Sequence, residues 1–382
     1  MSEFLHPYRT VYEPPPYPYD LLDQLRTVAV ERFGSAIDCS IGTPIDPPPA
    51  AVVEALGASN AERGYPPSIG SDAFRTSAAR WLERIVGVSV DPASQIGAVV
   101  GTKEFVAGTP HYLRMRHPER DTILFPEIAY PSYAQGAVFS GCRAVPVPLD
   151  DQWRMDLSAI DPADAARALC LWVNTPGNPA GGLDDLAAVA QWGRDHGVLV
   201  LSDECYIEFT WDGPPQSILQ HGSDGVLAVH SLSKRSNFAG ARAGFYAGDA
   251  ELVHYLREVR KHGGMLIPGP VQAASVVAFD DQSHVNEQRQ RYWERLQVGR
   301  DLLRAAGAEV ELPGGGFYLW ARASDGDSWG LARVLAERAG VIVSPGEFYG
   351  DASAYVRLAV VQPTEELERA LARFTGEGPE ES

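Results

Sequence analysis

Lysine is almost missing from this chain of 382 residues, which has only Lys103, Lys234 and Lys261. The other members of its 32 basic residues are all arginines. Arginine keeps its proton in proteins, so a reaction that needs an amine nucleophile has three candidate residues and no more.

Positive charge, long apolar runs and cysteine are scarce as well. The 32 Lys and Arg face 50 Asp and Glu, and the formal net charge of −18 would repel a phosphate backbone, so we expect no nucleic-acid partner. No apolar run reaches about 18 residues and the amino terminus lacks a signal-peptide pattern, so we expect a cytoplasmic protein without a membrane partner. The cysteines lie far apart without paired spacing, which indicates neither a metal site nor a disulfide framework: Cys39, Cys142, Cys170 and Cys205.

From about residue 95 onward, short apolar runs alternate with helical patterns. This alternation predicts an α/β fold with a mostly parallel sheet and right-handed crossovers. The runs at 168–173 and 198–201 are apolar at every position, as in strands that are covered on both faces. The expected strands are seven: 96–100, 122–125, 144–147, 168–173, 198–201, 226–230 and 243–247.

The pattern changes near residue 270, and the change predicts a second, smaller α+β domain. One or two long helices are expected over 272–306, and short strands follow them. The length also suggests about two domains. The expected segments are an N-terminal arm with part of the small domain (1–45), a large domain (46–270) and a small C-terminal domain (271–382).

Polar clusters directly follow three of the expected strands. They occupy residues 174–182, 202–206 and 231–244. Each cluster alone could be an ordinary turn with polar caps. Because ligands bind beyond the carboxyl ends of the strands in an open parallel sheet, we expect the three clusters to form one site.

The third cluster combines an amine with groups that bind phosphate. Lys234 lies among hydroxyls and arginines, and positive neighbours with partial burial lower the pKa of a lysine and free its amine to attack a carbonyl. Ser231, Ser233 and Arg242 offer two hydroxyls and a guanidinium to a phosphate dianion. The helix expected to begin at 101–103 adds backbone N–H donors for the same anion.

The second cluster supplies a carboxylate. Asp203 ends an otherwise apolar strand and needs a partner, which a protonated ring nitrogen would provide. Tyr206, three residues further on, can reach a neighbouring oxygen. An amine, a phosphate site and a carboxylate for a ring nitrogen together indicate a site for pyridoxal 5′-phosphate.

With these motifs, the sequence resembles the class I/II aminotransferases, which are pyridoxal-phosphate enzymes of fold type I. The resemblance covers nearly the whole chain and rests on Ser231-x-Ser233-Lys234, on Arg242 eight residues later, and on Asp203-x-x-Tyr206. It implies a large pyridoxal-phosphate-binding domain with a seven-stranded, mostly parallel sheet, and a smaller α+β domain. Within the family the sequence is most similar to the actinobacterial succinyldiaminopimelate transaminases, in residues 16–20, 40–49, 202–208, 230–245 and 260–274.

The resemblance also implies a role for each matching residue. Lys234 would hold the cofactor covalently and then shuttle a proton, and Asp203 would keep the pyridine nitrogen protonated. Tyr206 and Asn178 would hydrogen-bond the 3′ oxygen, and Tyr130 would stack on the ring. The expected phosphate contacts are Thr102, Lys103, Ser231, Ser233 and Arg242, with Tyr65 from the neighbouring copy of the chain. The expected substrate contacts are Arg357, which would clamp the α-carboxylate, Asn178, and the loop at Gly42, which would close over the substrate.

A homodimer follows from two of these expectations. A complete phosphate site needs Tyr65 from the neighbour, and the segment 7–19, rich in proline and tyrosine, needs a surface on which to dock. We therefore expect this segment to be a docked arm rather than a free tail.

Two departures from the family pattern leave the core chemistry intact. The usual Asn-Pro-Thr-Gly reads Asn178-Pro-Ala-Gly, and the triple glycine at 314–316 is looser than the usual motif. The residues near the cofactor do not separate a transaminase from another pyridoxal-phosphate enzyme, such as a carbon–sulfur lyase or a decarboxylating synthase. A binding domain without turnover is disfavoured because Lys234, Asp203 and Arg357 are all present.

The identity of the substrate is the least determined feature. Arg357 indicates an α-amino acid and its 2-oxo acid counterpart. Arg235, next to Lys234, and the basic cluster at 260–262 favour a long anionic substrate, although surface charge explains both equally well. The resemblance favours N-succinyl-LL-2,6-diaminopimelate with 2-oxoglutarate, in lysine and diaminopimelate biosynthesis. The alternatives are an aspartate, aromatic or kynurenine-like substrate.

Overall fold

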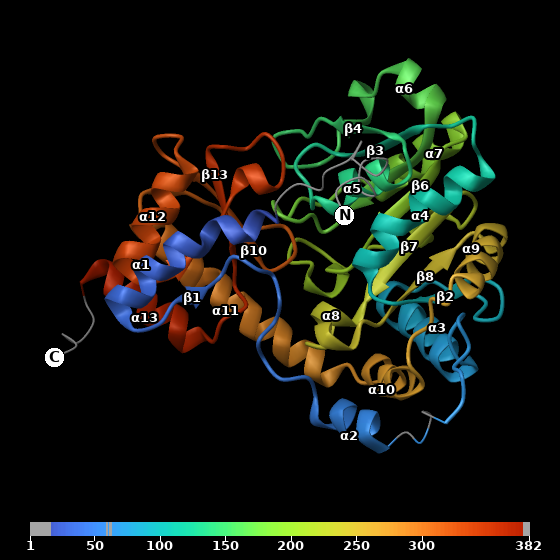
Figure 1. The fold of residues 1–382 in the computed structure, drawn as a ribbon, viewed down its shortest axis with the longest axis horizontal. Helices are drawn as coiled ribbons and strands as arrows, with labels where there is room; N and C mark the ends of the chain where they lie inside the picture. Colours follow the sequence, from blue (N-terminus) through green and yellow to red (C-terminus); the bar gives the residue numbers. More distant parts are fainter. Residues whose placement is uncertain (1–16, 59, 61–62, 377–382) are drawn as a thin grey trace, which may run out of the picture.

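The computed structural model describes residues 17–58, 60 and 63–376, which form a large and a small lobe (Figure 1). Most of the expected arm at 7–19 and the acidic end at 377–382 lie outside the described residues. In the described part, no helix is both long and apolar enough to cross a bilayer.

The large lobe is built on a seven-stranded sheet within the described residues, as the sequence predicts. The strand order is β2-β8-β7-β6-β5-β3-β4, and only β8 runs antiparallel to its neighbours. The seven strands are β2 (Ile96–Val99), β3 (Thr122–Pro126), β4 (Arg143–Val147), β5 (Ala168–Asn174), β6 (Leu199–Asp203), β7 (Val226–Ser231) and β8 (Gly244–Gly248).

Helices cover both faces of this sheet, which explains the continuously apolar central strands. The apolar side chains form one core on each face of the sheet. One face carries α2 (Ala50–Ala58), α3 (Asp72–Val86), α7 (Leu186–His196) and α10 (Gly269–Asp280). The other face carries α4 (Thr102–Arg116), α5 (Ser132–Phe139) and α9 (Ala250–His262).

Local sequence signals set the ends of these helices. Helix α7 starts after Asp185, whose side chain accepts a hydrogen bond from the Ala188 N–H, and it stops at Gly197 in the left-handed conformation. The connection from α7 to β6 is therefore short, and the next polar cluster follows at the carboxyl end of β6.

The small lobe combines the two ends of the chain. Its main sheet is antiparallel, and a short parallel pair joins an N-terminal strand to a C-terminal one. The main sheet has the order β12 (Ser344–Pro345), β13 (Tyr355–Ala359), β10 (Tyr318–Ala323) and β9 (Ala308–Glu309), and the pair is β1 (Ile37–Asp38) with β11 (Val341–Ile342). The helices of this lobe are α1 (Asp23–Phe33), α11 (Ser283–Ala305), α12 (Ser328–Ala339) and α13 (Thr364–Thr375).

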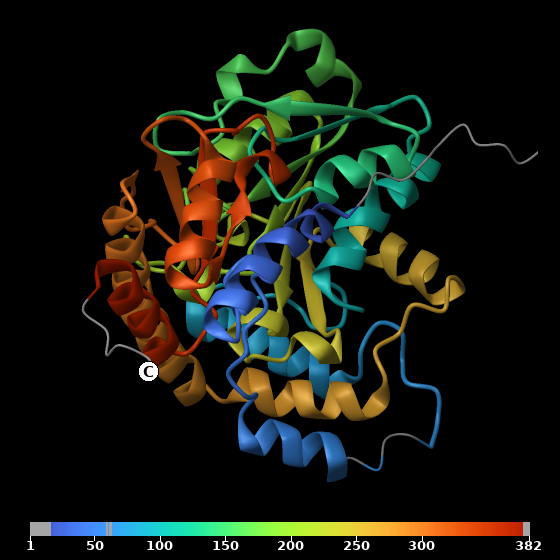
Figure 2. The ribbon, with the colours of Figure 1, turned by 60° about the vertical axis from the view of Figure 1, so that its left-hand side comes forward.

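The expected domain boundary at residue 270 stays a prediction. The two helices that follow it pack against different lobes. Helix α10 packs against α2 and α3 of the large lobe, as Figure 2 shows at the base of the molecule. Helix α11 then runs into the small lobe and packs against α13. The chain therefore passes between the lobes after α10.

Candidate active site

A cavity of about 230 Å³ lies beyond the carboxyl ends of β5, β6 and β7, between the two lobes. The three polar clusters that follow these strands meet there, as the sequence predicts. All of the predicted site residues except Tyr65 line it: Gly42, Thr102, Lys103, Tyr130, Asn178, Asp203, Tyr206, Ser231, Ser233, Lys234, Arg242 and Arg357.

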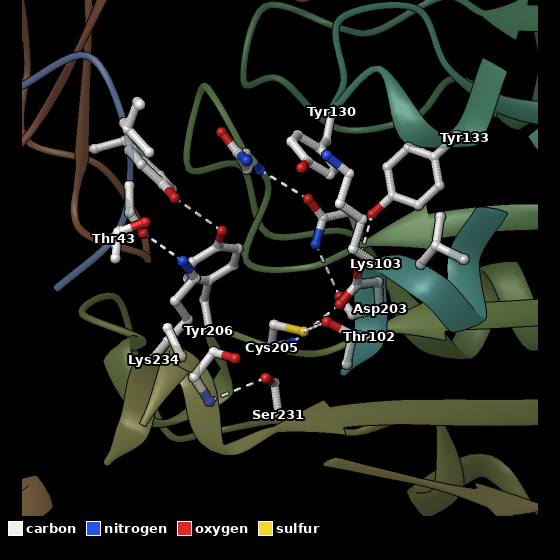
Figure 3. Close-up of a pocket in the computed structure, with 18 of the residues that line it drawn as sticks. Thr43, Thr102, Lys103, Tyr130, Tyr133, Asp203, Cys205, Tyr206, Ser231 and Lys234 are labelled. Atoms are coloured by element: carbon white, nitrogen blue, oxygen red, sulfur yellow. Dashed lines mark hydrogen bonds between the residues drawn. The ribbon is translucent and has the colours of Figure 1, made fainter. Parts of the chain in front are cut away.

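Lys234 is carried by the short helix α8 (Leu232–Arg235), directly after β7 (Figure 3). Its Nζ donates a hydrogen bond to the backbone oxygen of Gly42, which belongs to the small-lobe side of the cavity. Burial lowers the pKa of Lys234 to about 8, and the positive charges of Arg357 and Arg242 add to this effect. A substantial fraction of the amine is therefore neutral near pH 8 and can attack a carbonyl.

An anion site lies at the start of α4. Gly101 has φ +76°, and a side chain there would collide with the guanidinium of Arg242. Thr102 follows as the first residue of the helix, whose free N–H groups favour an anion. Ser231 and Ser233 face the same space, and the Ser231 hydroxyl accepts a hydrogen bond from the Ser233 N–H.

Asp203 is the last residue of β6 and is buried. Its Oδ1 accepts a hydrogen bond from the Cys205 N–H at 3.2 Å, and its Oδ2 accepts one from the Tyr133 hydroxyl at 2.9 Å. Burial raises the pKa of the carboxyl, and the hydrogen bonds from Cys205 and Tyr133 oppose the rise. A cation bound next to this carboxylate would stabilise its charged form.

Tyrosines form much of the remaining wall. The hydroxyls of Tyr206 and Tyr318 lie 2.9 Å apart, and the Tyr318 hydroxyl occupies the space that a side chain at Gly42 would need. The Lys103 Nζ lies 5.6 Å from the ring centres of both Tyr17 and Tyr130. Its side chain therefore lies among aromatic rings, while its backbone N–H belongs to the first turn of α4.

Arg357 enters the cavity from β13 and is 1% exposed. Its Nη1 donates to Asn178 Oδ1 at 2.8 Å, and its Nη2 donates to the Ser40 carbonyl at 2.5 Å. The rings of Tyr318 and Tyr349 lie 4.4 and 4.7 Å from the guanidinium carbon. Within the described residues no carboxylate forms an ion pair with Arg357, so its charge is held by aromatic faces and neutral oxygens.

Arg235 and Arg260 do not support the prediction of a long anionic substrate, which rested partly on their charges. Arg235 is buried on the far side of α8, where its Nε donates to Glu208 Oε1 at 2.5 Å. Arg260 is buried against Glu104, with Nη2 and Oε2 2.8 Å apart. Both guanidiniums are neutralised inside the protein, and neither residue lines the cavity. Lys261 lies on the surface beside Glu258.

Tyr65 lies away from the cavity and is 99% exposed. Its role toward a neighbouring copy therefore remains a prediction.

Sequence reasoning missed several residues of the site. Tyr133 could have been noticed as the second tyrosine of Tyr130-Pro-Ser-Tyr, one helical turn after the first. Tyr318 lines the cavity from the small lobe, and Tyr349 packs on Arg357 behind it; no local pattern in the sequence marks either residue. Tyr19 belongs to the segment 7–19 that the sequence predicts to dock on a surface, but it was not among the predicted site residues; its hydroxyl lies 3.1 Å from that of Tyr349.

The residues present fit pyridoxal 5′-phosphate on structural grounds. The anion site has backbone donors, two serines and an arginine where Gly101 leaves space for them. A buried carboxylate at Asp203 suits a protonated ring nitrogen, and Lys234 is an amine with a lowered pKa. The fold and the site together define an enzyme of the fold-type I pyridoxal-phosphate class.

Comparison with known families agrees with this class. Residues 36–374 match the family model of aminotransferase class I and II. The chain therefore belongs to this family and is a pyridoxal-phosphate-dependent aminotransferase.

Similar proteins differ in the substrates that their names state. The chain is 41% identical to the 4-dedimethylamino-4-oxo-anhydrotetracycline transaminase OxyQ of Streptomyces rimosus, over 95% of this chain and 99% of that one. It is 33% identical to the LL-diaminopimelate aminotransferase of Aquifex aeolicus, over 94% and 96% of the two chains. A solved structure described as a "probable N-succinyldiaminopimelate aminotransferase" from Thermus thermophilus superimposes with a TM-score of 0.84, at 30% identity, over 94% and 100% of the two chains.

Proposed function

We propose that this aminotransferase exchanges the amino group between N-succinyl-LL-2,6-diaminopimelate and 2-oxoglutarate, in lysine and diaminopimelate biosynthesis. The similarity to a probable N-succinyldiaminopimelate aminotransferase and to LL-diaminopimelate aminotransferases supports a long dicarboxylic amino acid. The observation that carries the proposal is a pair of cations, Arg357 and Lys103, which face the cavity without a carboxylate partner among the described residues.

The two cations suit two carboxylates on one substrate. Arg357 would hold the α-carboxylate through its two Nη groups, because its ring and amide neighbours orient the guanidinium without neutralising it. Lys103 would meet a distal carboxylate between Tyr17 and Tyr130. Burial disfavours the charged amine of Lys103, but the neighbouring phenols Tyr130 and Tyr17 raise its pKa, so it stays a cation.

The bound cofactor would supply an aldehyde for the amine and an electron-accepting ring. Lys234 would hold the cofactor through its Nζ and then carry the proton between the substrate α-carbon and the cofactor. Asp203 would hold the proton on the ring nitrogen. Tyr206 and the Asn178 amide would donate to the ring oxygen, and Tyr130 would pack on the ring face.

The phosphate would lie at the start of α4, against the residues that surround Gly101. The backbone N–H groups of Thr102 and Lys103 would donate to it, while the Lys103 side chain stays free for substrate. Ser231, Ser233 and Arg242 would complete this contact. On the opposite side, the segment at Gly42 and the Tyr318 hydroxyl would limit the entry of water.

A second candidate substrate is a polycyclic aromatic ketone. The 41% identity to a transaminase of 4-dedimethylamino-4-oxo-anhydrotetracycline favours it, and so do the aromatic side chains at the cavity, among them Tyr17, Tyr19 and Tyr130. Such a substrate would leave Arg357 without its α-carboxylate in that half of the reaction. We therefore rank it second.

The proposal includes a homodimer that completes each site. The stretch from Ile41 to Tyr65 presents several exposed apolar side chains, among them Ile45 and Val53, which suits an interface with a second copy. Sedimentation velocity of the holoenzyme tests this, and a fully active monomer would contradict it.

A substrate panel tests the proposed activity. We expect the highest kcat/KM for N-succinyl-LL-2,6-diaminopimelate, compared with LL-diaminopimelate, aspartate, phenylalanine, kynurenine and the tetracycline ketone. Lys103→Met should lower kcat/KM for the dicarboxylic substrates by about 10-fold or more and leave phenylalanine nearly unchanged, because a charge-assisted hydrogen bond is lost. Equal or higher efficiency with any other member of the panel would overturn the substrate assignment and leave the transaminase chemistry in place.

A further inference from the structure

We propose that Tyr133 is a positioning residue for the cofactor, acting through Asp203. This inference rests on the role proposed above for Asp203 at the ring nitrogen. Tyr133 lies in the first turn of α5, three residues after Tyr130, so one short helix and the turn before it would present both a ring-stacking side chain and a donor to the carboxylate.

Among the residues that the structure describes, the Tyr133 hydroxyl has one hydrogen-bond partner, Asp203. The side chain is 1% exposed, and its hydroxyl donates to Asp203 Oδ2 at 2.9 Å (Figure 3). The ring packs against Trp172 of β5, with centroids 5.4 Å apart, which fixes the direction of the hydroxyl. Burial and the neighbouring Asp203 raise the pKa of the phenol well above its usual value, so it remains a donor at any working pH.

The contact orients one carboxylate oxygen and favours the ionised form of the carboxyl. The Cys205 N–H holds Oδ1 and the Tyr133 hydroxyl holds Oδ2, so the carboxylate plane is fixed from two elements. The titratable groups that face Asp203 are Tyr133 from α5, Cys205 from the loop after β6, and Lys234 from α8. Both hydrogen bonds favour the anion, which burial alone would disfavour.

Loss of this hydroxyl should therefore weaken binding of the cofactor without unfolding the protein. The probe is pyridoxamine 5′-phosphate, which has the ring nitrogen but no aldehyde and so does not depend on attachment to Lys234. We expect Tyr133→Phe to weaken its binding by about 10- to 100-fold in titrations of the cofactor-free protein. The pH at which binding is lost on acidification should rise by about one to two pH units, because the Asp203 carboxyl is protonated more easily.

A mutant cycle separates this role from a structural one. Tyr255→Phe is the matched control. The Tyr255 hydroxyl is partly buried and donates to the Tyr112 carbonyl at 2.7 Å, away from the cavity. This control should keep the wild-type affinity. In an Asp203→Asn background, Tyr133→Phe should cost less than about 3-fold, because no anion remains to be held.

Affinity of Tyr133→Phe within twofold of wild type, or an equal loss in both backgrounds, would overturn the inference. A smaller folded fraction does not blur the result, because the pH midpoint is measured on folded protein alone. The titration contains no amino acid or oxo acid, so its outcome is independent of the substrate proposed above.

Discussion

The two walls of the cavity are built in different ways. The large-lobe wall consists of residues at or just after the ends of parallel strands, such as Asp203, Ser231 and Lys234. The small-lobe wall consists of an arginine on an antiparallel strand between the rings of Tyr318 and Tyr349. The first wall offers proton-transfer groups and an anion site, and the second offers a fixed cation. Under the roles proposed above, the cofactor therefore contacts the large-lobe wall, and the α-carboxylate of the substrate contacts the small-lobe wall.

The difference between the walls is clearest in the partners of two buried arginines. Arg235 and Arg357 are 3% and 1% exposed, so both guanidiniums have lost most of their water. Arg235 is paired with Glu208, whereas the partners of Arg357 in the described part of the chain are neutral oxygens and ring faces. A buried charge without an acidic partner is costly, and it is consistent with a site that binds an anion. Burial alone does not distinguish the two arginines, but the partners do.

The strongest test of the division between the walls is removal of the amine. Lys234→Ala should abolish covalent attachment of pyridoxal phosphate and lower kcat by at least about 100-fold, because the proton carrier is lost. Lys103→Ala and Lys261→Ala should retain attachment. Borohydride reduction followed by peptide mapping identifies the labelled residue, and label on another lysine would refute the assignment.

Removal of the cation from the other wall should affect substrate and not cofactor. Arg357→Gln should lower kcat/KM for α-carboxylate substrates by about 30-fold to several thousand-fold, the effect of truncating one partner of a buried charge pair. Attachment of the cofactor should persist, as absorbance spectra will show. A variant that loses the cofactor instead would contradict the separation of the two walls.

Arg235→Gln is the matched control for this second change. Removing one partner of a buried ion pair should reduce the free energy of unfolding by about 3–5 kcal/mol, measured by denaturant titration. The folded fraction should keep more of its kcat/KM than Arg357→Gln does. The opposite order of effects would show that Arg235, and not Arg357, serves the substrate.

The smallest expected effect is the influence of the Arg357 charge, on one wall, on the pKa of Lys234, on the other. The rate at which pyridoxal phosphate attaches to the cofactor-free protein should rise with pH to a midpoint near 8, because attachment needs the neutral amine of Lys234. Arg357→Gln should raise this midpoint, since a positive neighbour that disfavours the charged amine is removed. Stopped-flow absorbance over a pH series measures both, and an unchanged midpoint would show that the walls are electrically independent.

The lowered pKa of Lys234 also predicts the direction in which the stability of the cofactor-free protein changes with pH. Between pH 8 and the ordinary value of 10.5, the unfolded chain binds more protons at Lys234 than the folded chain does. This group therefore makes the cofactor-free protein more stable as pH rises through that window. The contribution should be absent from Lys234→Met in parallel unfolding measurements.

The sequence by itself determined the large sheet and the large-lobe wall. Periodicity located the central strands, such as β5 and β7, because they are buried on both faces. A residue just after such a strand must lie at the carboxyl edge of the sheet, wherever the rest of the chain goes. Asp203 and Lys234 could thus be predicted to lie at the site from local spacing and from the resemblance to a known family, and both line the cavity. Arg357 was identified as a candidate because an arginine interrupts an apolar strand.

Tertiary structure alone decided which polar groups meet. Tyr133 and Asp203 are 70 positions apart, and Tyr206 and Tyr318 are 112 apart, so no local pattern encodes either contact. Arg235 follows Lys234 directly, yet successive side chains on a helix point about 100° apart, and this one meets Glu208 instead of the cavity. Composition counts a charge, but only the folded chain decides whether another charge already neutralises it.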